Sequence, residues 1–219
     1  MILEVQKRHN DNLALLDPAV GEQVYIQLCF DPMASQQAFL FLPDISGFTK
    51  FVQSTESAHS QHVIAEILEL LLEANQIDLE LAEIEGDALF MYRKTLPTAQ
   101  ELYDQVHAMF KTFHEHLALL RTHRICPCNA CLTAPELELK IIAHAGPLEF
   151  IQVQNQIKPF GPQVIEAHRL MKNSVPSDNY FLVSQTLFDA LELNHSNHEI
   201  FTFSAGRDVY DDREVHYHY

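Results

Sequence analysis

Short apolar runs and helical stripes of apolar residues follow one another along this chain. The continuous runs are typical of strands buried on both faces, and they cover Ala38–Leu42, Ala88–Tyr92, Leu137–Ala143 and Tyr180–Val183. The stripes have the 3.6-residue period of amphipathic helices, and they cover Val63–Leu81, Thr98–Leu120, Val164–Met171 and Gln185–Leu191. Because the elements lack a regular βαβ rhythm, we predict an α+β fold, a mostly antiparallel central sheet with helices packed on one face.

Local signals predict where these elements begin and end. Pro43 is expected to end the first apolar strand, with Asp44 at its C-terminal end, and Gly146-Pro147 is expected to turn the chain. Gly86-Asp87 is expected to form the tip of a β-hairpin. Thr98 and Glu101 have the spacing of a capping box, which predicts a helix start.

The first 36 residues precede the regular succession of predicted strands and helices. We divide the chain into an N-terminal extension, residues 1–36, and one larger domain, residues 37–219. The extension contains one apolar run that favours a strand, Val24–Phe30, which ends at the turn-prone Asp31-Pro32.

Composition narrows the class of protein. Hydrophobic residues make up 47% and charged residues 20% of 219 residues, as in ordinary globular domains. We find no spanning helix and no secretory leader in the sequence, so we expect a cytoplasmic protein with no membrane partner. Fourteen Lys and Arg against thirty Asp and Glu give a net charge of −16, which disfavours binding to nucleic acid.

Two carboxylates stand out by their positions in the predicted sheet. Asp44 follows one apolar strand and Asp87 lies at a hairpin tip, so neighbouring strands would bring the two together. Carboxylate oxygens are the ligands that magnesium prefers. The other interpretation is local, since Asp44 could cap the next helix while Asp87 serves the turn.

Three of the four cysteines lie within six residues, Cys126, Cys128 and Cys131. Three thiolates at this spacing suit a tetrahedral zinc if a fourth ligand is added, and His123, His144 or a second protomer could supply it. A redox-active cluster and plain reduced thiols are the other interpretations.

Several motifs, taken in order, resemble those of class III adenylate and guanylate cyclases. The resemblance runs from about Ala38 to the C-terminus and rests on Phe41-Leu-Pro-Asp-Ile-Ser-Gly-Phe-Thr49, Glu83-Ile-Glu-Gly-Asp-Ala-Leu-Phe-Met91, Ala143-His-Ala-Gly-Pro147, Phe160-Gly-Pro-Gln-Val-Ile-Glu-Ala-His-Arg169 and Phe181-Leu-Val-Ser184. With its Cys-x-Cys-x-x-Cys insert, the chain is most similar to an uncharacterised bacterial cyclase-like family, a domain of unknown function. The resemblance implies a ferredoxin-like core and a homodimer with sites between its protomers.

The resemblance also implies roles for individual residues. Asp44 and Asp87 match the metal-binding aspartates, and the Ile45 carbonyl matches a further ligand of magnesium or manganese. Glu83 matches the residue that reads the purine, and a carboxylate there implies a guanine nucleotide. Arg169 matches the arginine that stabilises charge on phosphate oxygens in the transition state.

Other positions depart from the cyclase pattern. Ile165 stands where cyclases keep an Asn that orients the ribose, and Pro162 stands where they keep a second base-reading Asp. The C-terminal tail has no lysine to serve as the second phosphate-binding cation, although Arg207 or Arg213 could substitute. Two hypotheses follow. One is a divergent metal-dependent cyclase, a phosphorus–oxygen lyase that binds a nucleoside triphosphate. The other is a catalytically degenerate homologue that acts as a nucleotide- or zinc-binding sensor or scaffold.

Overall fold

The structure is a computed structural model in which the chain divides into two compact units, residues 1–34 and residues 35–219. The described residues are 5–7, 13–16, 23–26, 36–123, 126, 128–193 and 202–219, with the backbone alone described before residue 37 and at residue 156. In the first unit, three short antiparallel strands pair in chain order, β1 (Val5–Lys7), β2 (Leu13–Leu16) and β3 (Gln23–Ile26). The strand predicted over Val24–Phe30 overlaps β3, and its residues 27–30 lie outside the described part.

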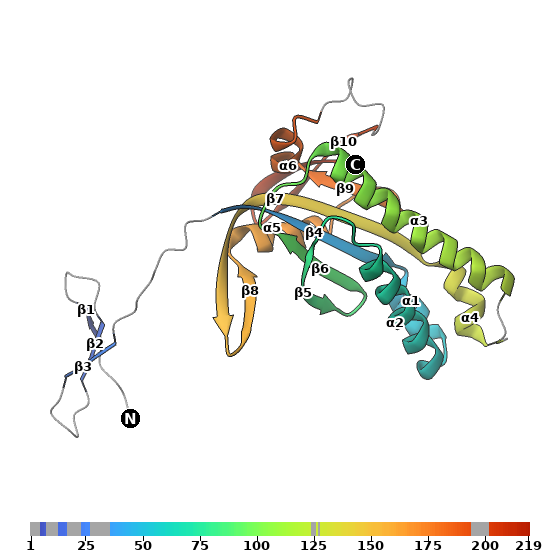
Figure 1. Cartoon of the computed structure of the whole chain (residues 1–219), viewed down its shortest axis with the longest axis horizontal. Helices are drawn as coiled ribbons and strands as arrows, with labels where there is room; N and C mark the ends of the chain where they lie inside the picture. The colour runs from blue at the N-terminus through green and yellow to red at the C-terminus, as the bar shows by residue number, and fades with distance from the viewer. Residues whose placement is uncertain are drawn as a thin grey trace. The chain divides into compact units, whose positions relative to one another are not determined.

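The second unit is built on one large sheet with the strand order β10-β11-β9-β7-β4-β6-β5, and β8 pairs with the far end of β7 (Figure 1). Its strands are β4 (Gln36–Ser46), β5 (Glu80–Glu85), β6 (Ala88–Arg93), β7 (Glu138–Val153), β8 (Gln156–Phe160), β9 (Tyr180–Ser184), β10 (Ala205–Tyr210) and β11 (Arg213–His218). Its helices are α1 (Phe48–Ser54), α2 (Ser57–Glu73), α3 (Ala99–His123), α4 (Asn129–Thr133), the 3-10 turn η1 (Ala134–Glu136), α5 (Pro162–Leu170) and α6 (Gln185–Ala190). Only the β7–β9 pair in this sheet is parallel, so the predicted α+β class and mostly antiparallel sheet are confirmed.

The expectation that Pro43 ends the first strand is wrong. The strand β4 runs for 11 residues through Pro43 and Asp44, because β7 pairs with it along its whole length, from Gln36 to Ser46. On the other side, the pairing with β6 stops at Phe41 and resumes at Asp44. Proline has no N–H to donate to a ladder, so this gap accommodates Pro43 inside the sheet.

The turn expected at Gly146-Pro147 is also wrong. The strand β7 continues for 16 residues through this dipeptide, whose partners in β4 are Ala38 and Gln37. Gly146 serves close packing instead, because a Cβ at this position would lie 2.6 Å from the side chain of Gln163 on α5. The Gln163 side chain is itself held by buried His144, whose Nε2 lies 2.8 Å from its Oε1.

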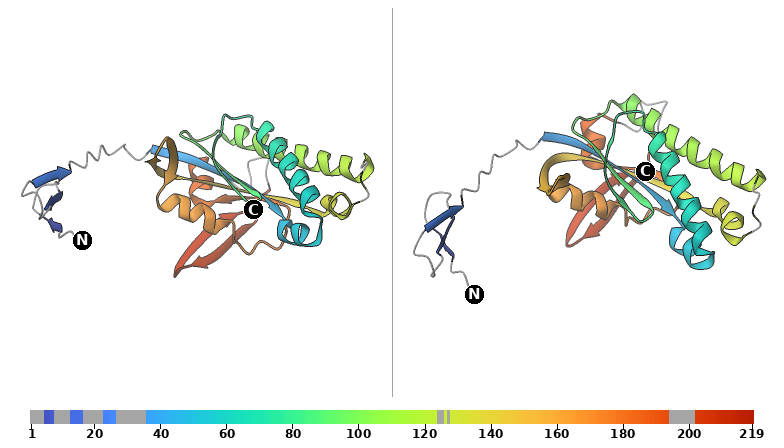
Figure 2. Two further views of the ribbon diagram at one scale, coloured as in Figure 1. Left: turned by 90° about the horizontal axis from the view of Figure 1, so that it is seen from below. Right: turned by 60° about the horizontal axis from the view of Figure 1, so that its bottom comes forward.

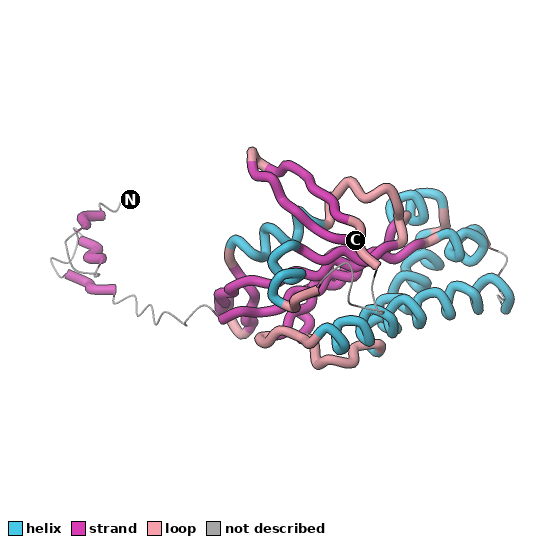
Figure 3. The backbone as a smooth tube through the Cα atoms, turned by 90° about the horizontal axis from the view of Figure 1, so that it is seen from above, coloured by secondary structure: helices cyan, strands magenta, loops and turns pink. Residues whose placement is uncertain are grey.

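Alternate residues of the central strands enter two different cores. Phe39 and Phe41 of β4 pack with α2 and α3, whereas Leu40 and Leu42 pack with the residues of α5. The long helices α2 and α3 lie side by side, and α5 lies on the opposite side of the strands (Figures 2 and 3). The expectation of helices on one face is therefore incomplete, because the α5 stripe buries Ala167 and Leu170 against the second face.

Two local predictions are confirmed. The backbone N–H of Glu101 donates to Thr98 Oγ1 at 3.1 Å and the N–H of Thr98 donates to Glu101 Oε2 at 2.7 Å, the reciprocal pair of a capping box. Gly86 and Asp87 form the turn between β5 and β6, with Gly86 at a φ of 68°. Across the described ranges, none of the helices combines the length and the apolar character needed to cross a bilayer.

The packing of Gln163 on Gly146 gives a prediction about stability. Gly146→Ala should lower the free energy of unfolding by about 1–3 kcal/mol, because the new methyl group displaces a side chain that also holds His144. Urea unfolding followed by circular dichroism measures this change. In a Gln163→Ala background the same glycine substitution should cost clearly less. Equal costs in the two backgrounds would show that Gln163 is not the obstacle.

Candidate functional site

The two predicted carboxylates lie together on one face of the sheet. Asp44 of β4 is directly opposite Ala88 of β6, so Asp87 in the preceding turn lies beside it. The backbone N–H of Ile45 donates to the carbonyl of Asp87 at 3.3 Å and fastens the turn to β4. Burial, followed by repulsion from the Asp44 carboxylate, raises the pKa of Asp87 to about 6. Two carboxyls so close repel each other unless a cation or a proton is added.

Lys140 is the residue of this site that the sequence analysis missed. It stands opposite Asp44 in the register of β4 with β7, and its Nζ lies 2.8 Å from Asp44 Oδ2. The same ammonium donates to the carbonyl of Met171 at 3.3 Å. Burial works to lower the pKa of Lys140, but the ion pair with Asp44 outweighs burial and raises it. A lysine within the apolar run Leu137–Ala143 was the available signal, because a buried lysine needs a partner.

A cavity of about 980 Å³ opens over these residues, and we refer to it as the carboxylate cavity. Its described lining includes four of the chain's 14 Lys and Arg residues, Lys50, Lys140, Arg169 and Lys172. Four carboxylates line it too, Asp44, Glu85, Asp87 and Asp178. A chain of net charge −16 thus has a cavity in which formal positive and negative charges balance.

Arg169 of α5 lies between the carboxylate cavity and a smaller one of about 440 Å³. Its guanidinium pairs with the carboxylate of Asp211 in the turn between β10 and β11. Arg213 lines the smaller cavity with Arg169. Arg207, the other cation considered for the C-terminal tail, instead pairs with Glu214 at 2.8 Å and is largely exposed. Of the two candidates, only Arg213 therefore lies near Arg169.

Glu83 lies apart from the carboxylate cavity of its own chain. It is exposed on β5, and its Oε2 lies 2.8 Å from Nζ of Lys158 on β8. Glu85, two residues further along the same strand, lines the cavity and lies 3.4 Å from His168 Nδ1. A base-reading role for Glu83 therefore requires a ligand bound outside this cavity or one shared with a second protomer.

The positions that depart from the cyclase pattern lie on α5. Ile165 lines the carboxylate cavity with 53% of its surface exposed, and its side chain offers no hydrogen bond to a ligand. Pro162 occupies the first turn of the helix, where its missing N–H leaves no intrahelical bond unmade. Neither residue therefore supplies the polar side chain that cyclases have at its position.

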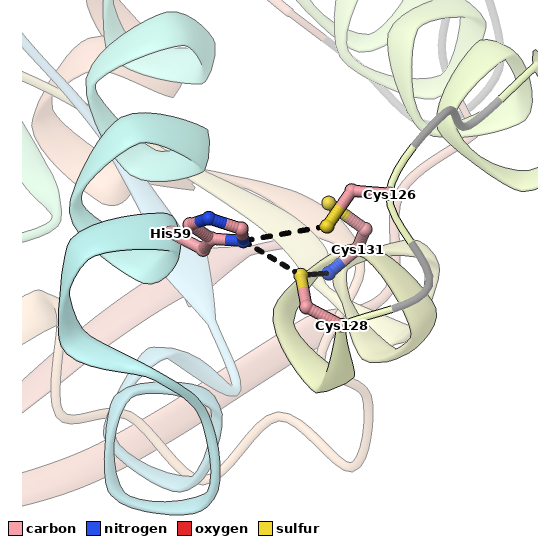
Figure 4. Close-up of side chains that lie close together, drawn as sticks. All are labelled: His59, Cys126, Cys128 and Cys131. Atoms are coloured by element: carbon pink, nitrogen blue, oxygen red, sulfur yellow. Dashed lines mark hydrogen bonds between the residues drawn. The ribbon is translucent and has the colours of Figure 1, made fainter.

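The three clustered cysteines lie beside a histidine from a distant part of the chain. The ligand atoms of His59, Cys126, Cys128 and Cys131 all lie within 4.8 Å of one another (Figure 4). His59 Nδ1 is 2.9 Å from Cys128 Sγ and 3.6 Å from Cys126 Sγ. Such a group could hold a metal ion.

His59 was missed because it precedes Cys126 by 67 residues, so no spacing rule connects them. The two histidines proposed as fourth ligands make other contacts. The ring of His123, at the end of α3, lies 2.7 Å from Thr122 Oγ1. His144 is buried in the sheet against Gln163.

Comparisons with solved structures show the fold. The adenylyl cyclase CyaB from P. aeruginosa superposes with a TM-score of 0.56 at 15% identity, over 84% of this chain and 92% of that one. The guanylate cyclase domain of RhGC from Catenaria anguillulae gives 0.55 at 14% identity, over 84% and 95%. The fold is therefore that of class III nucleotidyl cyclase domains, as the motifs predicted.

Comparisons with sequences place the chain among relatives of undefined activity. The family model described as "Protein of unknown function (DUF2652)" matches residues 64–180, which are 117 of the 219 residues. The "Uncharacterized protein Rv2561/Rv2562" of Mycobacterium tuberculosis is 27% identical over 129 residues, 59% of this chain. The match covers 60% of that relative's length.

The Asp44–Asp87 contact predicts a pH-dependent stability. A raised pKa means that folded Asp87 binds its proton more tightly than the unfolded chain does, so stability falls as pH rises from about 4 to above 6. With a chelator present, Asp87→Asn should therefore be more stable than the wild type at pH 7.5, by about 1 kcal/mol because water screens a half-exposed carboxyl. Unfolding by urea at a series of pH values should show this gain disappearing near pH 4. Asp104→Asn, at an exposed position of α3, is the control. A similar gain in stability there would show that the effect is not specific to Asp87.

Proposed function

This chain belongs to the family described as "Protein of unknown function (DUF2652)", and we propose that it is a divergent, metal-dependent relative of the nucleotidyl cyclases that binds a nucleoside triphosphate. The observation that carries the proposal is the carboxylate cavity, where two touching carboxylates lie among four cationic side chains. The carboxylates suit a divalent cation, and the cations suit the phosphates that such an ion accompanies. A volume of about 980 Å³ is ample for a ligand of this size.

The donor groups fit magnesium or manganese. Asp44 and Asp87 would supply hard carboxylate oxygens, and the Ile45 carbonyl would be a further ligand. Their mutual repulsion, which raises the pKa of Asp87, favours the binding of a cation between them. When bound, such an ion activates an attacking hydroxyl and stabilises a departing pyrophosphate.

Lys140 would neutralise Asp44 in the absence of a metal ion. With Asp44 bound to a divalent cation, the Lys140 ammonium would be free to bind triphosphate oxygens within the cavity. Lys140 could then supply the phosphate-binding cation that the C-terminal tail lacks. Arg169 would stabilise negative charge on the phosphate, provided that it leaves Asp211.

The second cofactor in this proposal is a zinc ion at Cys126, Cys128 and Cys131. For such thiolate ligands we propose a reducing compartment, the cytoplasm.

A catalytically degenerate homologue is the second candidate, and α5 favours it. Ile165 presents an apolar side chain to the cavity, and Arg169 is held by a carboxylate of its own chain. A protein of this kind would bind the nucleotide without turning it over and would act as a sensor or scaffold.

We propose a homodimer for either candidate. The guanylyl cyclase domain of the RhoGC fusion protein from Blastocladiella emersonii is described as a non-canonical dimer in one solved structure and as a monomer in another, and the RhGC domain is described in complex with GTP. In the present chain the hairpin of β7 and β8 exposes three apolar side chains on one face, Ile151, Val153 and Phe160, and exposed Ile157 lies on its other face. Exposed apolar clusters of this kind favour association with a second copy.

Thermal unfolding with manganese and each nucleoside triphosphate tests nucleotide binding. The favoured nucleotide should raise the unfolding midpoint of the wild type by several degrees. Asp44→Asn and Asp87→Asn should abolish the shift, whereas Asp104→Asn should keep it. Mass spectrometry of the same mixtures should detect the cyclic nucleotide and pyrophosphate.

The outcomes separate the two candidates. A midpoint shift without any product from the wild type would favour the degenerate homologue. If no nucleotide shifted the midpoint at any manganese concentration, the cyclase and the nucleotide-binding form of the degenerate homologue would both be wrong, and a zinc-binding scaffold would remain.

Base preference tests the role of Glu83. A carboxylate accepts hydrogen bonds from N1–H and the 2-amino group of guanine, so GTP should raise the midpoint more than ATP. Glu83→Gln should reduce this difference while leaving the ATP shift unchanged. Lys158→Gln is the matched control for loss of the ion pair. Equal shifts for GTP and ATP with the wild type, under conditions where sedimentation shows a dimer, would refute the assignment.

A further inference from the structure

The cysteine cluster joins two elements that are distant in sequence. His59 lies in the first turn of α2, Cys126 lies between α3 and α4, and Cys128 caps the N-terminus of α4, which contains Cys131 (Figure 4). All four side chains converge on one point, and their ligand atoms lie within 4.8 Å of one another. A tetrahedron with metal–sulfur bonds of about 2.3 Å has edges of about 3.8 Å, so only small movements separate this arrangement from a coordination sphere.

We propose that His59, Cys126, Cys128 and Cys131 bind one structural zinc ion, and that this ion clamps the start of α2 to α4. The donor set is three thiolates and one imidazole, a set found in closed four-ligand zinc sites. Four protein ligands leave no open position, so the ion holds structure and performs no chemistry on a substrate. The inference rests on the zinc ion of the proposed function and adds its fourth ligand and its structural role, and it stands whether or not a nucleotide binds in the carboxylate cavity.

The elements around the cluster explain why a clamp is needed. The helix α4 has only five residues, which is too short for a stable helix in isolation. Its N-terminus is held by Glu56, whose carboxylate accepts hydrogen bonds from the N–H groups of Ala130 and Asn129. A metal ion bound by the cysteines and His59 would fasten α4 at a second point to the same end of α2.

The clamp lies close to one wall of the carboxylate cavity. The helix α1 begins at Phe48 and packs against both α2 and α4, and Phe48, Thr49 and Lys50 line the cavity. Loss of the ion would therefore loosen the segment from α1 to the first turn of α2, as well as α4, before it affected the sheet.

A reactive thiol is the competing explanation of the same cluster. The N–H of Cys131 and the ring of His59 lower the pKa of Cys128 to about 6, whereas burial and the neighbouring Cys128 raise the pKa of Cys131 to about 11. A low pKa in a metal-free cluster is expected at a zinc site and also at a redox site. Convergence favours zinc, because four ligand atoms meet at one point, as in a closed tetrahedral site, whereas a redox pair uses two sulfurs and leaves the third thiol without a role.

Elemental analysis of the protein purified under reducing conditions without chelator tests the proposal. The wild type should contain about one zinc per chain, and Cys128→Ser and His59→Ala should lose most of it. His59→Cys should keep the metal, because four thiolates also form a zinc site. His62→Ala, which removes an exposed histidine from the same helix, and His123→Ala should both keep it as well.

Hydrogen exchange distinguishes a clamp from an incidental metal. Removal of zinc from the wild type should speed amide exchange in residues 48–60 and 128–136 and leave β4 and β7 unchanged. Exchange that does not change on zinc removal would overturn the clamp.

Cobalt substitution of the wild type avoids variants that fail to fold. It should give the intense d–d bands of a tetrahedral site together with thiolate charge-transfer bands. If the protein held no stoichiometric zinc and gave no such cobalt spectrum, the site would be overturned. If His59→Ala kept its full zinc content, His59 would not be the fourth ligand.

Discussion

The register between β4 and β7 determines where every charged group of the carboxylate cavity lies. Directly paired residues point to the same face of a sheet, so Asp44 and Lys140 meet on the face covered by α5. The pairing of β4 with β6, the neighbour on the other edge of β4, brings Asp87 beside Asp44. A slip of one residue would turn Asp44 towards the core under α2 and α3, where an unpaired carboxylate is very costly. The core and the site therefore specify the same register.

The charges of the site compensate one another in spite of the acidic chain. Asp44 can be neutralised by Lys140 or by a metal ion, and Asp87 can be relieved by a proton or by the same ion. Each alternative removes repulsion between the two carboxyls at a different cost in solvation. The ion pair with Lys140 and a proton on Asp87 therefore offset the repulsion between the two carboxyls within the chain itself.

Sequence reasoning succeeded where a signal is local and periodic. The capping box at Thr98 and the hairpin at Gly86-Asp87 appear as predicted, because neighbouring residues decide them. Each helix stripe contains a helix, but the stripe predicted over Val63–Leu81 is too long, since α2 ends at Glu73 and β5 begins at Glu80. Sequence reasoning was wrong at Pro43 and at Gly146-Pro147, since long pairing between β4 and β7 overrides local turn preference.

Contacts between distant segments account for the remaining differences. Nothing in the sequence around the three cysteines indicates that His59 lies beside them, and the arrangement of α2 and α4 brings the four residues together. Lys140 was visible as a charge in an apolar run, but its partner depends on strand order. The pairing of Asp44 with Asp87 was foreseen because the family motifs carry tertiary information that spacing alone lacks.

The hairpin of β10 and β11 projects from the sheet and pairs with β9 through only two of its residues, Tyr217 and His218 (Figures 2 and 3). At its far end, Asp211 and Asp212 both have positive φ, 46° and 63°, a conformation for which glycine or asparagine would be the easier choice. The strained turn places the Asp211 carboxylate on Arg169. The hairpin is also anchored below this turn, because Asp208 accepts hydrogen bonds from the N–H and the hydroxyl of Ser174. The positive charge at the end of α5 is therefore balanced by a segment that is remote from the carboxylates in the strand order of the sheet.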